Sequence, residues 1–318
     1  MTSDISYTTE EIAKLLKISK LTVYDLIKKG DLPAYRVGKQ MRVDATDLDA
    51  YKTRAKSGQF AAVHKVDPKT PFIPSETPLL SSLNRSLVIT GQDVSLDILA
   101  KHIEKKITGI RPLRSYVGSL DSLISMYRGE SDIVSTHLLD GDTGDYNLPY
   151  IRKLLIGSSY VVVNLISRAA GLYVQEGNPK QLNAWSDLKL AGLRIANREK
   201  GSGARVLLDE QLRLHRIAPQ LLSGYEIEET NHMSVAGKVA SGEADVGVGI
   251  EKAANLVGGV TFIPLIQERY DLVMLKKPEN LAWIEQIKQI LQSDSFHNEL
   301  RFIHGYDLSL TGRILLET

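Results

Sequence analysis

Short apolar runs alternate with amphipathic segments over most of the chain that follows residue 85. Runs with the length and composition of strands lie at 86–90, 114–117, 132–135, 160–166, 193–196 and 244–248. Segments with apolar residues at helical spacing lie between them, at 96–103, 120–127, 203–214 and 235–241. This order is typical of a mainly parallel sheet with helices on both faces. The sequence therefore predicts an α/β fold for this part of the chain.

Composition limits the class of protein further. The chain has 318 residues, of which 43% are hydrophobic and 24% charged, as in a soluble protein of about two domains. No apolar run approaches the ~18 residues that span a bilayer, and the first residues lack the basic and apolar regions of a signal peptide. Cysteine is absent, which excludes a disulfide framework, a thiolate metal site and a cysteine nucleophile. We expect a cytoplasmic protein with no membrane partner.

The first 56 residues predict a separate, smaller domain. A first helix begins at Thr8 or Thr9, and a second helix is capped by Ser19 and ends at Gly30. Two short helices joined by about three residues form a helix-turn-helix. Two strands joined by a turn over 34–43 then predict a β-hairpin wing.

Basic residues gather in this small domain. The whole chain has a net charge of only +1, whereas residues 14–42 contain eight Lys or Arg and two Asp, a net charge of +6. Such a surplus attracts a phosphate backbone, although a solvated helix face has a similar charge pattern.

The segments 7–16, 19–24 and 30–38 resemble the winged helix-turn-helix of excisionase and MerR-type proteins. The resemblance covers residues ~6–55 and implies that the second helix enters the major groove of double-stranded DNA while the wing meets the adjacent backbone. It assigns DNA contacts to Ser19, Lys20, Thr22, Tyr24 and Lys28 on the helix, and to Arg36, Lys39, Gln40 and Arg42 on the wing. Most of these side chains suit phosphates rather than base edges. For Thr22 and Tyr24, completion of a small core is the alternative.

Residues 57–84 are predicted to be a linker, because several prolines interrupt any helix and no apolar period persists. The predicted domains are therefore 1–56, which binds DNA, and 85–318, which forms the α/β body.

Four predicted strand-to-helix joins in the body carry small polar residues. They lie at 90–93, 117–119, 200–205 and 230–234. Glycine permits close backbone approach, and the free N–H groups at a helix start attract negative charge. Ligands bind at the carboxyl ends of parallel strands, where such joins meet. Each join can also be a plain helix cap, but together they predict a site for a small anion.

The body resembles the cytoplasmic periplasmic-binding-protein-like domain, which is related in fold to molybdate- and tungstate-binding proteins. The resemblance spans ~85–312 and rests on the segments 118–123, 129–133, 137–140, 144–150, 197–209, 230–232, 242–251 and 268–272. Domains of this family are fused to helix-turn-helix heads and to molybdopterin-biosynthesis proteins. The resemblance implies two lobes, from ~85–160 plus the C-terminal stretch and from ~165–262, with a ligand cleft between them.

This resemblance also implies the ligand contacts. They are Thr90, Gly91 and Ser119 from one lobe, and Ser202, Gly203, Arg205, His232 and Glu251 from the other. Ser119 and Ser202 rank first, because each lies at a predicted helix N-terminus. Arg205 has an alternative partner in Asp209 one turn along the helix, and His232 has the alternative of a structural histidine. No covalent cofactor and no metal site are expected, and molybdate or tungstate is the expected effector.

The function that follows is a one-component transcription regulator, a homodimer in which ligand binding changes DNA binding. An enzyme or cofactor-handling protein of molybdopterin metabolism is the first alternative, with Asp93, His137, His232 and Glu251 as acid–base groups. The sequence shows no nucleophile–base pair, and we expect no enzyme. A regulator that senses a small organic acid is the second alternative, because the fold alone does not fix the ligand. Solute capture for an importer is disfavoured by the missing export signal.

Overall fold

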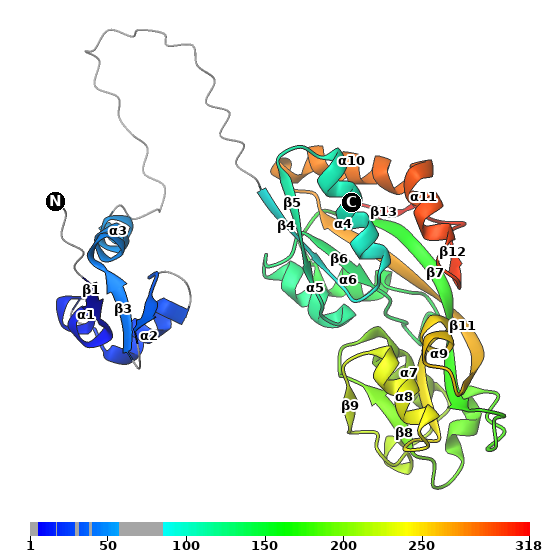
Figure 1. The fold of residues 1–318 in the computed structure, drawn as a ribbon. Coiled ribbons are helices and arrows are strands. Elements are labelled where there is room, and N and C mark those ends of the chain that lie inside the picture. Colours follow the sequence, from blue (N-terminus) through cyan, green and yellow to red (C-terminus); the bar gives the residue numbers. More distant parts are fainter. Residues whose placement is uncertain (1–5, 17, 29–31, 38–39, 57–84) are drawn as a thin grey trace. The chain divides into compact units, whose positions relative to one another are not determined.

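The computed structural model describes residues 6–16, 18–28, 32–37, 40–56 and 85–318. The chain divides into two compact units, Met1–Pro78 and Leu79–Thr318 (Figure 1). The predicted linker at 57–84 lies outside the described residues. Within the described part, every helix is too short or too polar to cross a bilayer.

The first unit has the elements of a winged helix-turn-helix. They are β1 (Ser6–Thr8), α1 (Thr9–Leu16), α2 (Lys20–Lys28), β2 (Tyr35–Val37), β3 (Gln40–Asp44) and α3 (Ala45–Lys56). The strands form an antiparallel sheet in the order β1-β3-β2. The core consists of side chains that are at most 1% exposed, Ile12, Val23, Leu32, Val43 and Leu48. The first strand, β1, was not predicted from the sequence.

Both predicted helix caps in this unit are confirmed. The N–H of Thr8 donates to Glu11 Oε2 at 2.8 Å and the N–H of Glu11 donates to Thr8 Oγ1 at 3.4 Å, so the two residues cap α1 reciprocally. The N–H of Thr22 donates to Ser19 Oγ at 3.1 Å, which caps α2.

The second unit is an α/β domain built on one ten-stranded sheet. Its strands are β4 (Arg85–Thr90), β5 (Ile110–Ser115), β6 (Ile133–Thr136), β7 (Tyr160–Gln175), β8 (Ile195–Arg198), β9 (Glu228–Glu229), β10 (Val246–Ile250), β11 (Val260–Leu275), β12 (Tyr306–Asp307) and β13 (Ile314–Glu317). Its α-helices are α4 (Ser95–Lys106), α5 (Ser119–Tyr127), α6 (Leu148–Leu154), α7 (Gly203–Leu214), α8 (His232–Ala240), α9 (Glu251–Val257), α10 (Leu281–Leu291) and α11 (Asp294–Arg301).

Two long strands join two lobes. β7 and β11 have 16 residues each and pair antiparallel along their whole length, from Val260 opposite Gln175 to Leu275 opposite Tyr160. Beyond them, β6, β4 and β5 continue the sheet into one lobe, and β10, β8 and β9 continue it into the other (Figure 1). The two-lobed α/β architecture predicted from the sequence is confirmed.

The sheet is parallel at its two flanks and antiparallel in the middle. β4 runs parallel to β5 and β6, and β8 runs parallel to β9 and β10, whereas β7 and β11 oppose their neighbours. The sequence predicted mainly parallel pairing, which describes the flanks alone. The predicted end of the strand at 166 was too early, because β7 continues to Gln175 through the polar pair Ser167 and Arg168, which interrupts the apolar pattern.

One predicted strand lies in a different place. Residues 114–117 were expected to form a strand, but β5 covers Ile110–Ser115. Its partner β4 ends where Thr90 pairs with Ser115, so Tyr116 and Val117 have no strand beside them. These two residues belong instead to the loop that leads into α5.

Helices cover both faces of the sheet in each lobe, as predicted for an α/β fold. In the first lobe, α4, α10 and α11 pack on one face and α5 and α6 on the other. In the second lobe, α7 packs on one face and α8 and α9 on the other. This double covering leaves the loops at the ends of the strands to form the surface between the lobes.

The crossing strands tolerate no side chain at Gly171 of β7. A Cβ at this position would lie 1.9 Å from the carbonyl oxygen of Ile263 in β11, so the Gly171→Ala variant must displace a strand backbone. We expect this variant to lose about 1–3 kcal/mol of the free energy of unfolding. Urea unfolding followed by tryptophan fluorescence measures it, because the two tryptophans of the chain, Trp185 and Trp283, both lie in the second unit.

The matched control is Gly237→Ala in α8, where a Cβ would meet no atom within 4 Å. Removing a glycine from a helix interior is expected to raise the free energy of unfolding by about 0.5–1 kcal/mol. Equal unfolding midpoints for the two variants would contradict the close approach of β7 and β11.

Candidate functional site

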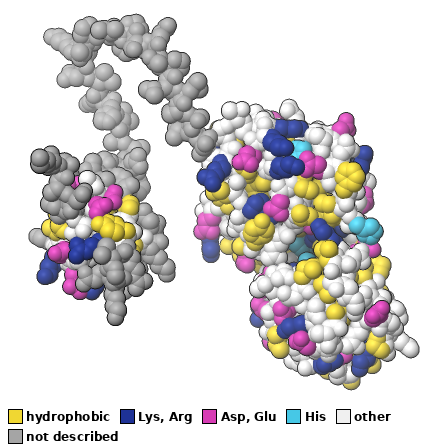
Figure 2. All heavy atoms as spheres, viewed as in Figure 1, with side chains coloured by type: hydrophobic (Ala, Val, Ile, Leu, Met, Phe, Trp, Pro, Cys, Tyr) yellow, Lys and Arg dark blue, Asp and Glu magenta, His cyan; other side chains and the backbone are white. Residues whose placement is uncertain are grey.

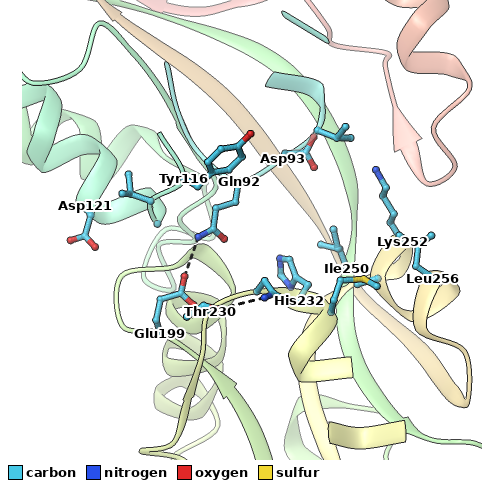
Figure 3. Close-up of a pocket in the computed structure, with 16 residues that line it drawn as sticks. Gln92, Asp93, Tyr116, Asp121, Glu199, Thr230, His232, Ile250, Lys252 and Leu256 are labelled. Carbon is cyan, nitrogen blue, oxygen red and sulfur yellow. Dashed lines mark hydrogen bonds between the residues drawn. The ribbon is translucent and has the colours of Figure 1, made fainter. Parts of the chain in front are cut away.

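Two contiguous cavities lie between the lobes of the second unit. The larger, which we call the outer cavity, has a volume of about 660 Å³, and the smaller, which we call the inner pocket, has a volume of about 50 Å³. Both are lined by loops that follow β4, β5 and β8, by the start of α8 and by the end of β10. The outer cavity, drawn in Figure 3, is also lined by α9. The inner pocket is lined by Gly91, Gln92, Asp93, Val117, Gly118, Ser119, His137, Arg168, Arg198, Ser202, Gly203, His232, Ile250 and Tyr270.

The N-termini of two helices from opposite lobes meet at the inner pocket. α5 begins at Ser119 and α7 begins at Gly203, and both residues line the pocket. The N–H groups of Ser119 and Gly203 donate to no acceptor in the part of the chain that the structure describes. Free N–H groups at a helix start carry the positive end of the helix dipole. The pocket therefore presents hydrogen-bond donors and partial positive charge from both sides.

Glycine allows the lobes to come this close. A Cβ on Gly118 would lie 3.0 Å from the carbonyl oxygen of Gly201, and a Cβ on Gly203 would lie 2.1 Å from the ring of His137. The N–H of Leu120 donates to the same Gly201 carbonyl at 3.0 Å. Backbone-to-backbone contact between the lobes thus depends on the small residues of these joins.

His137 contributes an uncharged ring to the pocket. The N–H of His137 donates to Ser119 Oγ at 3.3 Å, and the same oxygen lies 2.9 Å from His137 Nδ1. The Ser119 hydroxyl thus holds the ring through Nδ1, and the opposite nitrogen, Nε2, faces Gly203. Burial, together with the positive charges of Arg168 and Arg198, holds the pKa of His137 well below its ordinary value. The imidazole is therefore uncharged at neutral pH.

His232 is the second histidine of the pocket. Its Nδ1 atom is buried and has no hydrogen-bond partner among the described residues. Burial lowers the pKa of His232 well below its ordinary value, and Arg198, Arg168 and His137 lower it further. Buried polar atoms without a partner are rare because each is costly. This atom is available to a bound ligand.

Arg168 is fully buried between two carboxylates. Its Nε donates to Glu268 Oε1 at 2.5 Å, and its Nη1 donates to Asp93, which also accepts hydrogen bonds from Ser95 and from the Tyr306 hydroxyl. Burial opposes the ionisation of Asp93, but Arg168 and these hydrogen bonds outweigh it and place the pKa of Asp93 below its ordinary value. Burial raises the pKa of Glu268 in spite of Arg168. The guanidinium charge is thus largely neutralised within the protein.

Arg198 connects the two lobes. Its guanidinium donates to Glu199 at 2.7 Å within its own lobe and to Gln92 Oε1 of the other lobe, also at 2.7 Å. Gln92 completes the link by donating to Glu199 at 3.3 Å, the dashed contact beside Glu199 in Figure 3. The lobes are held together in a closed arrangement around the inner pocket.

The structure brings five of the eight predicted ligand residues together at the inner pocket. They are Gly91, Ser119, Ser202, Gly203 and His232. Ser202 also caps α7, since its hydroxyl accepts from the N–H of Arg205 at 3.3 Å. The predicted joins at 90–93, 117–119, 200–205 and 230–234 do meet between the lobes.

The other three predicted ligand residues line neither cavity. The hydroxyl of Thr90 is buried and points to the carbonyl of Ile133 at 3.5 Å. The guanidinium of Arg205 donates to Asp209 at 3.0 Å, which is the alternative that the sequence left open, and lies 4.2 Å from the Tyr225 ring centroid. Glu251 begins α9, but its neighbours Ile250 and Lys252 face the outer cavity instead.

Several pocket residues were absent from the predicted ligand set. Arg168 and Tyr270 lie on the crossing strands, and Arg198 ends β8, so none of them belongs to a glycine-containing join. Asp93 and His137 were considered only as acid–base groups. An arginine that interrupts a continuous apolar strand is the one sequence signal that pointed to Arg168.

The predicted DNA-binding residues are described in part. Thr22 and Tyr24 are exposed on α2, so the alternative that they complete the core is wrong. Lys20 is exposed and its Nζ lies 2.5 Å from Glu10 Oε1. Arg42 is half-buried and donates to Ser6 Oγ at 3.1 Å. Lys39 and the side chains of Lys28, Arg36 and Gln40 lie outside the described part of the chain.

Comparison with known proteins agrees with this architecture. Residues 100–292 match the description "PBP superfamily domain", and residues 6–56 match the description "Helix-turn-helix domain". The chain belongs to the PBP superfamily through its second unit and, over its whole length, to the family of the uncharacterized protein YvgK of Bacillus subtilis. That relative is 51% identical over 319 residues, which cover 100% of both chains. An uncharacterized protein encoded in the ferredoxin 2Fe-2S gene 5′ region of Clostridium pasteurianum is 43% identical over 112 residues, 35% of this chain and 99% of that one.

Two solved structures share the fold. One is an H₂O₂-bound mutant of OxyR from Corynebacterium glutamicum, with a TM-score of 0.51, 13% identity and coverage of 92% of this chain and 88% of that one. The other is described as a phosphate ABC transporter substrate-binding protein of Clostridium perfringens with bound phosphate, with a TM-score of 0.50, 17% identity and coverage of 69% and 98%. At these identities the likeness concerns the fold.

The lowered histidine pKa values predict a pH dependence of stability. A histidine that stays neutral when folded binds fewer protons than in the unfolded chain, where it titrates near pH 6.5. Acidification from about pH 7.5 to about pH 5.5 is therefore expected to lower the free energy of unfolding, by at most about 1.4 kcal/mol per pH unit for each such histidine. Tryptophan fluorescence during urea unfolding at several pH values measures the slope.

The variant His232→Gln is expected to flatten this slope, and His215→Gln, at an exposed position on the same lobe, is the matched control. A slope in His232→Gln equal to that of the wild-type chain would contradict a neutral His232 in the pocket.

Proposed function

We propose that this protein is a DNA-binding transcription regulator in which a small anion binds between the lobes of the second unit and alters DNA binding by the first. The observation that carries the proposal is the inner pocket, which helix starts from opposite lobes line with free N–H groups, at Ser119 and at Gly203. Donors without acceptors select an anion. A helix-turn-helix in the same chain supports a sensor rather than a carrier.

Anion binding would favour the closed arrangement of the lobes. The donors on α5 and α7 belong to different lobes, so an anion that contacts both bridges them. A ligand shifts a conformational equilibrium only through its different affinities for the two states. An anion that contacts both lobes binds the closed arrangement more tightly, because separating the lobes removes the contacts to one of them. We propose a homodimer in the cytoplasm, since two helix-turn-helix units on two half-sites multiply the affinity for DNA.

Two classes of effector fit the inner pocket. The resemblance to molybdate- and tungstate-binding proteins makes those oxyanions candidates, and the free N–H groups of Ser119 and Gly203 suit a tetrahedral oxyanion that needs many donors. A small organic acid is the other candidate, since a carboxylate takes the same donors.

The pocket favours binding over catalysis. Ser119 and His137 form the hydroxyl–imidazole pair that the sequence did not reveal, but Ser119 Oγ also accepts the backbone N–H of His137. The opposite ring nitrogen of His137 faces Gly203 rather than a carboxylate that would orient it. A nucleophile normally needs a base that a third group orients. We therefore propose that the protein is not an enzyme.

Removing either pocket hydroxyl is expected to weaken anion binding. Ser119→Ala removes the hydroxyl that holds the His137 ring, and Ser202→Ala removes the hydroxyl that caps α7 and donates to the Glu199 carbonyl. Each change loosens a helix start that supplies a donor to the ligand, which lowers the affinity about tenfold or more. The measurement is the melting temperature of the full-length chain by tryptophan fluorescence, with molybdate, tungstate, sulfate, phosphate and small organic acids. A ligand at a hundredfold excess over its Kd stabilises the folded state by ~2.7 kcal/mol.

The matched control is Ser125→Ala, which lies in α5 but outside both cavities. Ligand-free DNA binding should be unchanged in all three variants. Undiminished ligand shifts in both pocket variants would contradict the assignment of the pocket, and loss of DNA binding would show that these serines act as structural caps.

The exposed face of α2 is expected to bind DNA phosphates. In Lys20→Ala, binding to a mixed-sequence DNA duplex should weaken, and the slope of log K against log salt should fall by about 0.9, the value for one phosphate that is no longer neutralised. Fluorescence anisotropy at several salt concentrations measures both. Lys52→Ala on α3 is the matched control. A salt slope in Lys20→Ala identical to the wild-type slope would exclude Lys20 from the DNA interface.

A further inference from the structure

The outer cavity is far larger than a bare oxyanion needs. Its volume is about 660 Å³, against about 50 Å³ for the inner pocket, and the two share Gln92, Asp93, Val117, Gly118, His232 and Ile250. Pockets of roughly 300–1,000 Å³ are typical of sites for organic small molecules. A ligand whose charged head lies in the inner pocket can therefore extend into the outer cavity without a break.

Exposed apolar side chains from both lobes converge on the outer cavity. Val94 and Tyr116 come from the first lobe and are 37% and 62% exposed, and Met233 and Leu256 come from the second and are 42% and 65% exposed. Figure 3 shows Tyr116 on one side of the cavity, with Ile250 and Leu256 on the other. In the space-filling view, yellow apolar side chains lie on both lobes beside the narrow waist of the second unit (Figure 2). Apolar surface gathered in this way marks a binding site for an apolar group.

The fixed charges around the outer cavity leave no positive surplus. Asp93 is paired with Arg168, and Glu199 is paired with Arg198. The remaining charged groups that line it, Asp121 and Lys252, have opposite signs. The outer cavity therefore has no net positive charge with which to attract an anion. The anionic part of a ligand is confined to the inner pocket, and an uncharged part suits the outer cavity.

We infer that the effector is an organic anion, with a carboxylate, phosphate or similar oxyanion head in the inner pocket and an apolar or aromatic body in the outer cavity. This inference rests on the proposed anion-sensing function and selects between its two classes of effector. A bare inorganic oxyanion would fill the inner pocket and leave the apolar walls of Tyr116, Met233 and Leu256 in contact with water. A body placed between those walls removes them from water.

The experiment compares anions that share a head and differ in the body. Isothermal titration calorimetry with the full-length chain measures Kd for inorganic phosphate against phenyl phosphate and for acetate against phenylacetate, with molybdate and tungstate alongside. The body is expected to tighten binding at least about tenfold within each pair. Ser119→Ala should weaken both members of a pair by the same factor, since it acts on the head alone.

Substitutions of residues that line the outer cavity test whether the apolar body of the ligand binds there. Leu256→Ser and Met233→Ser replace exposed side chains on α9 and α8, and each should reduce the advantage of the organic anion at least about threefold while leaving the affinity for inorganic phosphate unchanged. Leu214→Ser, at an exposed position that lines neither cavity, is the matched control and should change neither affinity.

The outcomes separate this inference from the function on which it rests. Molybdate or tungstate binding as tightly as the best organic anion would overturn the inference and leave the anion-sensing function standing. A body advantage that survives in Leu256→Ser and Met233→Ser would also overturn it, because the body would lie elsewhere. If no anion binds, bare or organic, the anion-sensing function itself fails and the inference fails with it.

Discussion

The buried guanidinium of Arg168 joins the parts of the second unit that make the cleft. Arg168 lies on β7, its cross-strand partner Glu268 lies on β11, and Asp93 belongs to the loop that leads into α4. A buried charge is tolerated only where it is paired and hydrogen-bonded, so these groups hold one another in place. Tyr306, from the C-terminal stretch, adds a hydrogen bond to Asp93 at 2.5 Å. The crossing strands, the first lobe and the C-terminal stretch thus meet at one ionic cluster on the wall of the inner pocket.

This cluster decides what kind of attraction the pocket offers. Arg168 and Arg198 line it, yet each is already engaged by carboxylates of the protein. The free donors that remain are uncharged backbone N–H groups at the starts of α5 and α7, and they lie beside the neutral His137 ring. Recognition by such groups depends on their directions, and the contacts between the lobes hold these directions. In the function we propose, the same geometry links ligand selection to the arrangement of the lobes, and the outer cavity extends the selection to the body of the ligand.

Much of the fold could be predicted from the sequence, because the signals for most elements are local. Thr8 and Ser19 cap α1 and α2 through residues three positions away, and α7 occupies the predicted range from Gly203 to Leu214. The crossing strands were harder to predict. β7 was expected to end at 166, and β11 was not predicted, because these strands pass from one lobe to the other and change neighbours along their length. Alternating or continuous apolar patterns predict a strand with the same surroundings along its length. β7 and β11 each have two sets of neighbours, one in each lobe.

The candidate site, like the fold, could be predicted from the sequence only in part. The glycine- and serine-containing joins that precede helices indicated where the site lies, and the family resemblance assigned Gly91, Ser119, Ser202, Gly203 and His232 to it. The tertiary structure was needed to establish that Arg168 and Arg198 line the pocket while Arg205 does not. Arg168 meets partners 75 and 100 residues away, whereas Arg205 has Asp209 four residues along its own helix. A helix start is fixed by its neighbours in the chain, but the environment of a charged side chain depends on which distant segments the fold brings against it.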